Sequence, residues 1–184
     1  MGQDKAFLRL NGITLLEYAI ATAKDVCETV ALVGDKQRLS AYGWVVQDVY
    51  PGQGPLAGIH AALNSTAATE WNLCLAVDTP SLPVDFLDFL LTTAKASTAA
   101  VIVPRLNGQF QPLCAVYRSS FIISAEVALK ENQNKIDPLF ERVEARIIEA
   151  AEIKALGFPE SIFDNVNTPE DWQRMQRTFG ATHG

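Results

Sequence analysis

The chain has 184 residues, of which 48% are hydrophobic and 20% are charged, and this size and composition predict one globular α/β domain. The net charge of −6 excludes a basic stripe over the whole surface, so we expect no nucleic-acid partner. No run of about 18 apolar residues and no signal pattern marks a membrane segment, and three widely spaced cysteines predict reduced core thiols, so the expected location is the cytoplasm.

The first half of the chain alternates between helical and extended patterns. Apolar residues at helical spacing and short apolar runs predict the elements in turn. The expected helices cover 14–24, 56–63 and 84–91, and the expected strands cover 29–33, 44–46, 71–77 and 99–103. The strand over 71–77 is apolar at nearly every position, which predicts burial on both faces. This alternation is typical of a mostly parallel sheet flanked by helices.

The pattern changes after residue 104. Asn107 and Gly108 lie between two extended segments, and a return strand over 113–117 follows, which predicts a small antiparallel insert. Further helices are expected over 121–131, 137–142 and 169–179, and a short strand over 145–149. Thr168 is expected to cap the last helix.

Asp78 directly follows the apolar strand over 71–77 and precedes Thr79 and Pro80. Ligands of an open parallel sheet bind beyond the carboxyl ends of its strands, where Asp78 would lie. A carboxylate at this position suits Mg²⁺, which takes one or two acidic ligands together with phosphate oxygens. The alternative is a turn-forming side chain that bonds its own backbone.

A second candidate loop follows Asp48. It contains the Gly- and Pro-rich segment 51–55, whose glycines permit close approach of the backbone to a ligand. The helix that follows would offer its N-terminal amides to an anion or a base edge. Lys5, near the start of the chain, is by itself better explained as a solvated surface lysine, and only its neighbours in the pattern favour a role in binding.

Five segments in the same order resemble the molybdenum cofactor guanylyltransferase family: 1–6, 11–16, 48 with 51–58, 77–80, and 165–171. The resemblance covers essentially the whole chain. It implies a single nucleotidyltransferase domain over 1–184 with a Rossmann-like α/β fold, a mostly parallel sheet flanked by helices and a small antiparallel insert. The implied reaction moves GMP from GTP to the terminal phosphate of molybdopterin, or of the molybdenum cofactor, and releases pyrophosphate.

The resemblance also implies roles for individual residues. Lys5 and Asp78 would be catalytic, with Lys5 neutralising triphosphate charge and Asp78 holding Mg²⁺. The implied nucleotide-binding positions are Lys5, Asp48, Gly54, Pro55, Leu56 and Asp78. Asn165 and Asn167 would lie toward the acceptor, although asparagines before a helix are also good turn and cap formers.

Alternatives remain open at this stage. A related nucleotidyltransferase could use CTP or ATP or act on a sugar phosphate, and an inactive chain could instead bind partners in cofactor assembly. The partners expected for a molybdenum cofactor guanylyltransferase are GTP, molybdopterin or the molybdenum cofactor, and a molybdoenzyme or cofactor-assembly protein. The resemblance also expects a first strand and a Gly-Gly loop upstream of Met1, so we expect an N-terminally incomplete domain with little activity and low stability.

Overall fold

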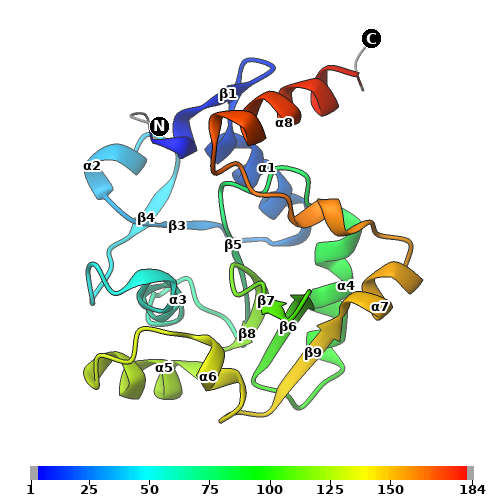
Figure 1. Cartoon of the computed structure of the whole chain (residues 1–184). Coiled ribbons are helices and arrows are strands. Elements are labelled where there is room, and N and C mark those ends of the chain that lie inside the picture. The colour runs from blue at the N-terminus through cyan, green and yellow to red at the C-terminus, as the bar shows by residue number, and fades with distance from the viewer. Residues whose placement is uncertain (1–3, 182–184) are drawn as a thin grey trace.

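The computed structural model describes residues 4–181, and Figure 1 shows how its elements are arranged. The helices are α1 Leu15–Val26, α2 Lys36–Leu39, α3 Gly54–Leu63, α4 Val84–Lys95, α5 Phe121–Lys130, α6 Asp137–Phe140, α7 Ala150–Ala155 and α8 Pro169–Ala181, with 3-10 turns η1 Lys5–Phe7 and η2 Glu160–Phe163. The strands are β1 Arg9–Leu10, β2 Ile13–Thr14, β3 Ala31–Val33, β4 Trp44–Val46, β5 Trp71–Leu75, β6 Val101–Leu106, β7 Gln109–Phe110, β8 Cys114–Arg118 and β9 Ala145–Glu149. None of the helices in this part of the chain is long and apolar enough to cross a membrane.

The largest sheet contains β5, β8, β6, β7 and β9. In β6, Val101 pairs with Tyr117 of β8 on one edge and with Ala145 of β9 on the other. Strand β8 runs antiparallel to both β5 and β6 and lies between them, so β5, β6 and β9 share one direction. The prediction of a mostly parallel sheet is therefore wrong for residues 4–181, where the parallel pairs are β3 with β4 and β6 with β9.

The cause of this difference is the hairpin after β6. Asn107 and Gly108 both have positive φ, 48° and 78°, as a two-residue type I′ turn requires. The turn sends β7 back along β6, and β8 continues in that direction and enters the sheet beside β5. The predicted hairpin and return strand are confirmed. The return strand, β8, lies inside the sheet between β5 and β6, so these two strands, which share one direction, each pair with an antiparallel neighbour.

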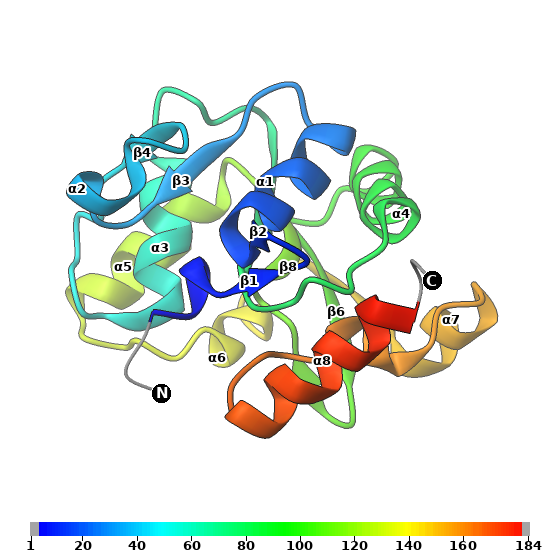
Figure 2. The same ribbon diagram turned by 90° about the horizontal axis from the view of Figure 1, so that it is seen from above.

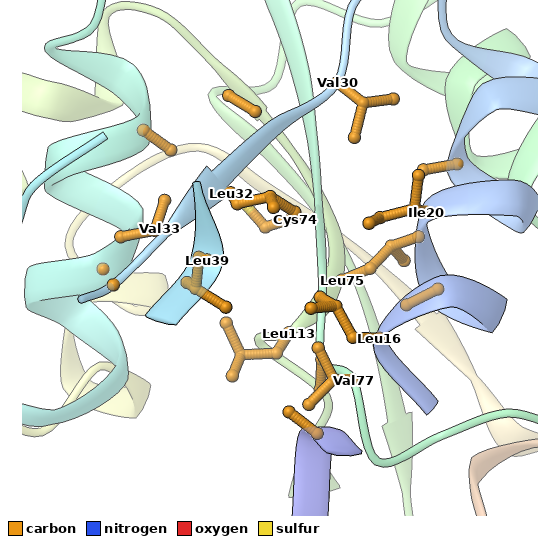
Figure 3. Close-up of a pocket in the computed structure, with 18 of the residues that line it drawn as sticks. Leu16, Ile20, Val30, Leu32, Val33, Leu39, Cys74, Leu75, Val77 and Leu113 are labelled. Atoms are coloured by element: carbon orange, nitrogen blue, oxygen red, sulfur yellow. The ribbon is translucent and has the colours of Figure 1, made fainter. Parts of the chain in front are cut away.

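Strands β3 and β4 form a separate two-stranded parallel sheet. A cavity of about 590 Å³, which we call the inter-sheet slot, lies between β3 and β5, with α1 and α3 on its two sides (Figure 3). Most of its wall is aliphatic, including Leu16, Ile20, Leu32, Leu39, Leu75 and Leu113. All five residues of β5 are only half-buried, so the prediction that this strand is buried on both faces is wrong. Three of them, Leu73, Cys74 and Leu75, line the slot.

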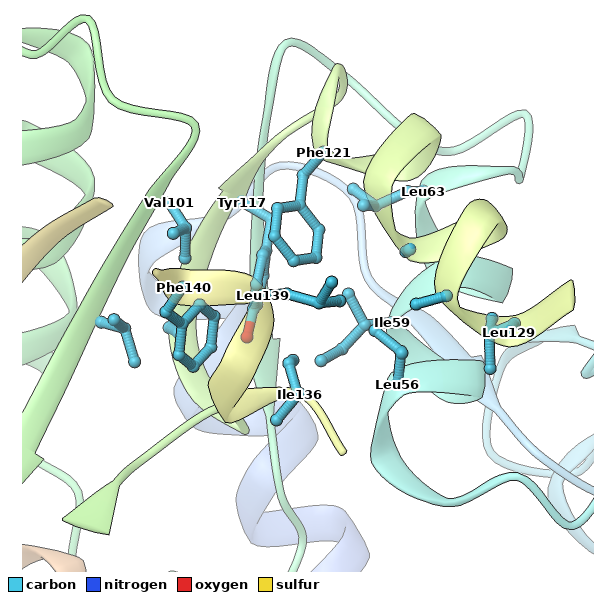
Figure 4. Close-up of a cluster of buried hydrophobic side chains, with 14 of the residues drawn as sticks. Leu56, Ile59, Leu63, Val101, Tyr117, Phe121, Leu129, Ile136, Leu139 and Phe140 are labelled. Atoms are coloured by element: carbon cyan, nitrogen blue, oxygen red, sulfur yellow. The ribbon is translucent and has the colours of Figure 1, made fainter. Parts of the chain in front are cut away.

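The core lies on both sides of the large sheet. On one side, α3, α5 and α6 pack around Tyr117 and Phe121, whose ring centroids are 5.0 Å apart (Figure 4). On the other side, α4 and α7 pack around Phe86, which contacts the rings of Phe158 and Phe163 edge-on. Cys114 is buried in this second layer, and all three cysteines are free thiols, as predicted.

A third, smaller cluster joins the first described segment to the last helix. Its buried members are Leu10, Leu15, Val166 and Met175. The ring of Tyr18 on α1 also packs edge-on against Phe179 of α8, with centroids 5.9 Å apart. Figure 2 shows α8 and the β1–β2 hairpin from above. This packing holds the two ends of the described chain together next to the carboxyl end of β5.

Two of the helices begin with reciprocal caps. The hydroxyl of Thr14 accepts a hydrogen bond from the Glu17 amide at 3.1 Å, and the Glu17 carboxylate accepts from the Thr14 amide at 2.8 Å. At α8, Thr168 accepts from the Asp171 amide at 3.1 Å, which confirms Thr168 as the predicted cap. Hydrogen bonds from the Thr168 amide and hydroxyl are the main reason that the pKa of Asp171 lies below its usual value.

Candidate active site

Three predicted site residues from distant parts of the sequence meet beyond the carboxyl end of β5. The Nζ atom of Lys5 lies 4.0 Å from Oδ2 of Asp78 and donates a hydrogen bond to Oδ1 of Asn167. We call this group the Lys5–Asp78–Asn167 cluster. Residues 1–3 of the predicted first segment lie outside the described residues.

The backbone around each of these residues explains its position. Lys5 begins the turn η1, whose cap Asp4 accepts a hydrogen bond from the Ala6 amide at 3.0 Å. Asp78 follows β5, and its backbone carbonyl accepts from the Val166 amide at 2.9 Å. Val166 is fully buried in the third hydrophobic cluster, so the packing of α8 against the first hairpin positions the adjacent Asn167.

The ion pair within the cluster is accessible to water. The side chains of Lys5 and Asp78 are 36% and 24% exposed. An ion pair with this exposure contributes at most about 1 kcal/mol to folding, because water screens both charges and holding the side chains in place costs entropy. A ligand that supplies phosphate oxygens and a cation can therefore separate the pair at little cost.

The oxygen atoms of this cluster fit a magnesium ion that shares its ligands with a substrate. Asp78 offers a carboxylate and Asn167 an amide oxygen, and Mg²⁺ is usually held by one or two carboxylates, water and phosphate oxygens. Across residues 4–181, no three His, Cys, Asp or Glu side chains gather where they could hold a metal ion. The described residues therefore suit a cation that arrives with a phosphate ligand rather than one enclosed by protein.

A further cation lies close to the cluster and was missed in the sequence. Arg38 of α2 forms an ion pair with Asp4, the residue before Lys5, and its guanidinium carbon lies 5.4 Å from the centroid of the Phe7 ring. Asp35, which caps α2, directly precedes this helix at the carboxyl end of β3. A signal was available in the sequence, because the helix cap Asp35 and the basic residue Arg38 follow closely after a strand. Asp78 was found from a similar position, directly after β5.

The predicted nucleotide loop forms the start of α3. Gly54 has φ of 72°, a conformation that favours glycine, and Pro55 follows in the first turn. Gln53, at the cap position, makes no capping hydrogen bond through its side chain. Leu56 is fully buried in the core, so only its backbone amide could face a ligand. Pro55 also borders the inter-sheet slot, as does Asp78.

The structure does not bring Asp48 into the Lys5–Asp78–Asn167 cluster. Its Oδ1 accepts a hydrogen bond from the Tyr50 amide at 2.8 Å, and the Tyr50 ring packs edge-on against His60. Burial holds the pKa of His60 below its usual value, so this imidazole is neutral at pH 7. Asn165 is exposed and is separated from Asn167 by the buried Val166.

Comparison with known proteins gives consistent results. Residues 1–147 match the family model for the MobA-like NTP transferase domain. A probable molybdenum cofactor guanylyltransferase from Carboxydothermus hydrogenoformans is 31% identical over 180 residues, covering 97% of this chain and 90% of that protein. A molybdenum cofactor guanylyltransferase from Desulfosudis oleivorans is 28% identical over 183 residues, covering 98% and 89%.

A solved structure is also similar over nearly the whole chain. The molybdopterin-guanine dinucleotide biosynthesis protein A from Archaeoglobus fulgidus superimposes with a TM-score of 0.85 at 24% identity, covering 98% of this chain and 92% of that one. At this identity the likeness shows the α/β nucleotidyltransferase fold.

Proposed function

This chain belongs to the MobA-like NTP transferase family, and from that membership we propose that it transfers GMP from GTP to the terminal phosphate of molybdopterin, or of the molybdenum cofactor, with release of pyrophosphate. The observation that carries the proposal is the Lys5–Asp78–Asn167 cluster, which combines a cation, a carboxylate and an amide oxygen at the carboxyl end of β5. Such a set can bind a triphosphate together with its metal ion.

In this proposal the cations neutralise the charge of the triphosphate. Lys5 leaves Asp78 and contacts phosphate oxygens, which is inexpensive because the ion pair is accessible to water. Arg38 supplies a second positive charge from the carboxyl end of β3, where its present partner is Asp4. Charge neutralisation of this kind supplies much of the catalysis in phosphoryl-type transfer, which needs no protein nucleophile.

Asp78 and Asn167 would hold Mg²⁺ together with phosphate oxygens of GTP. The ion, when bound, neutralises phosphate charge and makes the α-phosphorus more open to attack. The part played by the protein is to fix the direction of the triphosphate relative to the acceptor phosphate, because transfer requires the two reacting groups to be in line. The exposed Asn165, next to this cluster in sequence, would face the acceptor.

The guanine nucleotide would lie along the start of α3. There Gly54 keeps the backbone open, and the Leu56 amide donates to the nucleotide, while the Leu56 side chain stays in the core. Asp48 would face the ribose or the base once its carboxylate has released the hydrogen bond from the Tyr50 amide. We place the reaction in the cytoplasm, with a molybdoenzyme or a cofactor-assembly protein receiving the product.

The test measures Mg²⁺-dependent GTP binding by calorimetry and then pyrophosphate release with molybdopterin present. GTP should bind at least about tenfold more tightly than CTP and ATP, a difference of about 1.4 kcal/mol in binding free energy. Chelation of the metal should abolish both GTP binding and pyrophosphate release. Lys5→Met should weaken both readouts. Ile123→Ser, at an exposed position on α5, should change neither.

Equal use of the three nucleotides would overturn the guanylyl assignment, and metal-independent binding would overturn the role of Asp78. Binding is the primary readout, because it tests the Lys5–Asp78–Asn167 cluster without the acceptor.

A further inference from the structure

We propose that Gln53 reads the base of the nucleotide, with its Oε1 atom accepting hydrogen bonds from the N1–H and N2–H groups of guanine. The assignment rests on the proposed function, because it concerns the nucleotide that would lie along the start of α3. It is carried by an unpartnered polar atom, by the open backbone beside that atom and by the pattern of donors on guanine.

The first observation is that Gln53 has a covered oxygen without a hydrogen-bond donor. Among residues 4–181, the buried side-chain nitrogen and oxygen atoms without a hydrogen-bond partner are Gln53 Oε1, His60 Nδ1 and Arg118 Nε. Arg118 pairs with Trp71 at the amino end of β5, the end opposite the candidate site. The His60 ring packs edge-on against Tyr50. A buried acceptor without a donor costs free energy, so a ligand that supplies a donor to Gln53 binds more tightly.

The second observation is that the Gln53 side chain takes no part in its own helix. Gln53 stands at the cap position of α3, where short side chains such as Ser or Asp usually bond the first amides, but its side chain makes no capping hydrogen bond. Its backbone is nevertheless fixed, because its amide donates to the Tyr50 carbonyl at 3.3 Å. The carboxamide is therefore held at the start of α3, and its oxygen remains available to a ligand.

The third observation is that the backbone on both sides of Gln53 is open. Gly52 and Gly54 are exposed and have φ of 81° and 72°, and a Cβ atom added to either would meet no neighbouring atom within 4 Å. A flat base can therefore approach this segment closely. The Gln53 side chain is only half-buried, so rotation about its own bonds brings the oxygen to a base placed there.

The start of α3 then matches the donors and acceptors of guanine. The Leu56 side chain is buried in the core, which fixes its backbone amide in the first turn of the helix (Figure 4). That amide donates to O6 of guanine, and the Gln53 oxygen, which has two lone pairs, accepts from N1–H and N2–H. Adenine has an acceptor at N1, and cytosine has acceptors at N3 and O2. Their lone pairs would face the Gln53 oxygen, and a site built for a donor rejects a base that lacks it.

The experiment compares GTP with inosine triphosphate, which differs from GTP only in lacking the N2 amino group. Calorimetry with Mg²⁺ measures both dissociation constants for the unchanged protein and for two variants of the whole chain. Gln53→Met keeps the length of the side chain and removes the carboxamide. Gln53→Glu keeps an oxygen that accepts and, when ionised, cannot donate. Gln176→Met, the same change at an exposed position on α8, is the matched control.

In the unchanged protein, GTP should bind at least about tenfold more tightly than inosine triphosphate, the effect of about one hydrogen bond. In Gln53→Met the two affinities should differ by less than about threefold, whereas Gln53→Glu and Gln176→Met should keep the preference. The unfolding temperature of Gln53→Met should stay the same or rise, because an apolar side chain replaces a buried acceptor that has no donor. A side chain with only a structural role would not change the ratio of the two affinities.

Failure of this assignment and failure of the proposed function give different results. Mg²⁺-dependent GTP binding whose preference over inosine triphosphate is absent, or is unchanged in Gln53→Met, would overturn the reading of the base by Gln53 and leave the proposed function in place. A fall of more than about 4 °C in the unfolding temperature of Gln53→Met, with equal weakening of both nucleotides, would make the side chain structural. Absence of Mg²⁺-dependent GTP binding by the unchanged protein would overturn the proposed function and this assignment with it.

Discussion

Replacing Asp78 by Asn separates a role in binding from a role in folding. The substitution keeps the shape of the side chain and removes its charge. The backbone carbonyl of residue 78 still accepts the Val166 amide, so the attachment of the C-terminal segment remains. The lost ion pair with Lys5 is 4.0 Å long and accessible to water, which limits the loss of stability to about 1 kcal/mol. For a chain of this size, the unfolding temperature should fall by less than about 4 °C.

The effect on binding and turnover should be much larger. Removal of one charged group that acts on a phosphoryl transition state typically costs about 10²–10³-fold in rate, and we expect a loss of this size in Mg²⁺-dependent pyrophosphate release. GTP calorimetry with and without Mg²⁺ measures the binding part. Asp88→Asn, the same change at an exposed position on α4, is the matched control. Metal-dependent GTP binding that stays within about threefold of the unchanged protein would refute the role of Asp78, and a fall of more than about 10 °C would make the residue structural.

Three further substitutions or measurements test the packing. Tyr117→Phe removes the hydroxyl that donates to the Pro112 carbonyl at 2.8 Å, and chemical denaturation should show a loss of about 1–3 kcal/mol; an unchanged midpoint would contradict this. Thr14→Ala removes the α1 cap and should cost about 1 kcal/mol by the same assay; an unchanged free energy of unfolding would contradict a stabilising cap. Cys114 is buried, and burial raises the pKa of its thiol, so iodoacetamide at pH 8 should label Cys114 at least about tenfold more slowly in the folded protein than in the unfolded chain; rapid labelling read by mass spectrometry would argue against this environment.

Local patterns were sufficient to predict most elements of the fold. The segments 44–46 and 145–149 are strands with the predicted bounds, because short apolar runs between turn residues have few other stable conformations. The predicted helix over 14–24 is α1, for which Thr14 is the cap and which ends two residues later than predicted, at Val26. The order of the strands could not be predicted in the same way, because it depends on contacts such as Val101 with Tyr117, which are distant in sequence.

The sequence was sufficient to predict which residues belong to the candidate site, but not how they are arranged in space. Lys5, Asp78 and Asn167 lie together, although nothing in their local patterns specifies a distance between them. Leu56 was expected at the nucleotide, but its apolar side chain is more stable in the core, which leaves only its backbone for binding. Arg38 was missed because a four-residue helix has too little periodicity to be predicted and its partner Asp4 is 34 residues away.

The hydrogen bond between Lys5 and Asn167 joins residues separated by 162 positions. During synthesis Lys5 is made long before Asn167 and the α8 helix that packs beside it. At ordinary rates of about 5–20 residues per second, a separation of 162 residues means that Lys5 is made roughly 8–30 seconds before Asn167. A nascent chain that has not yet been extended past Asn167 therefore lacks the complete Lys5–Asp78–Asn167 cluster.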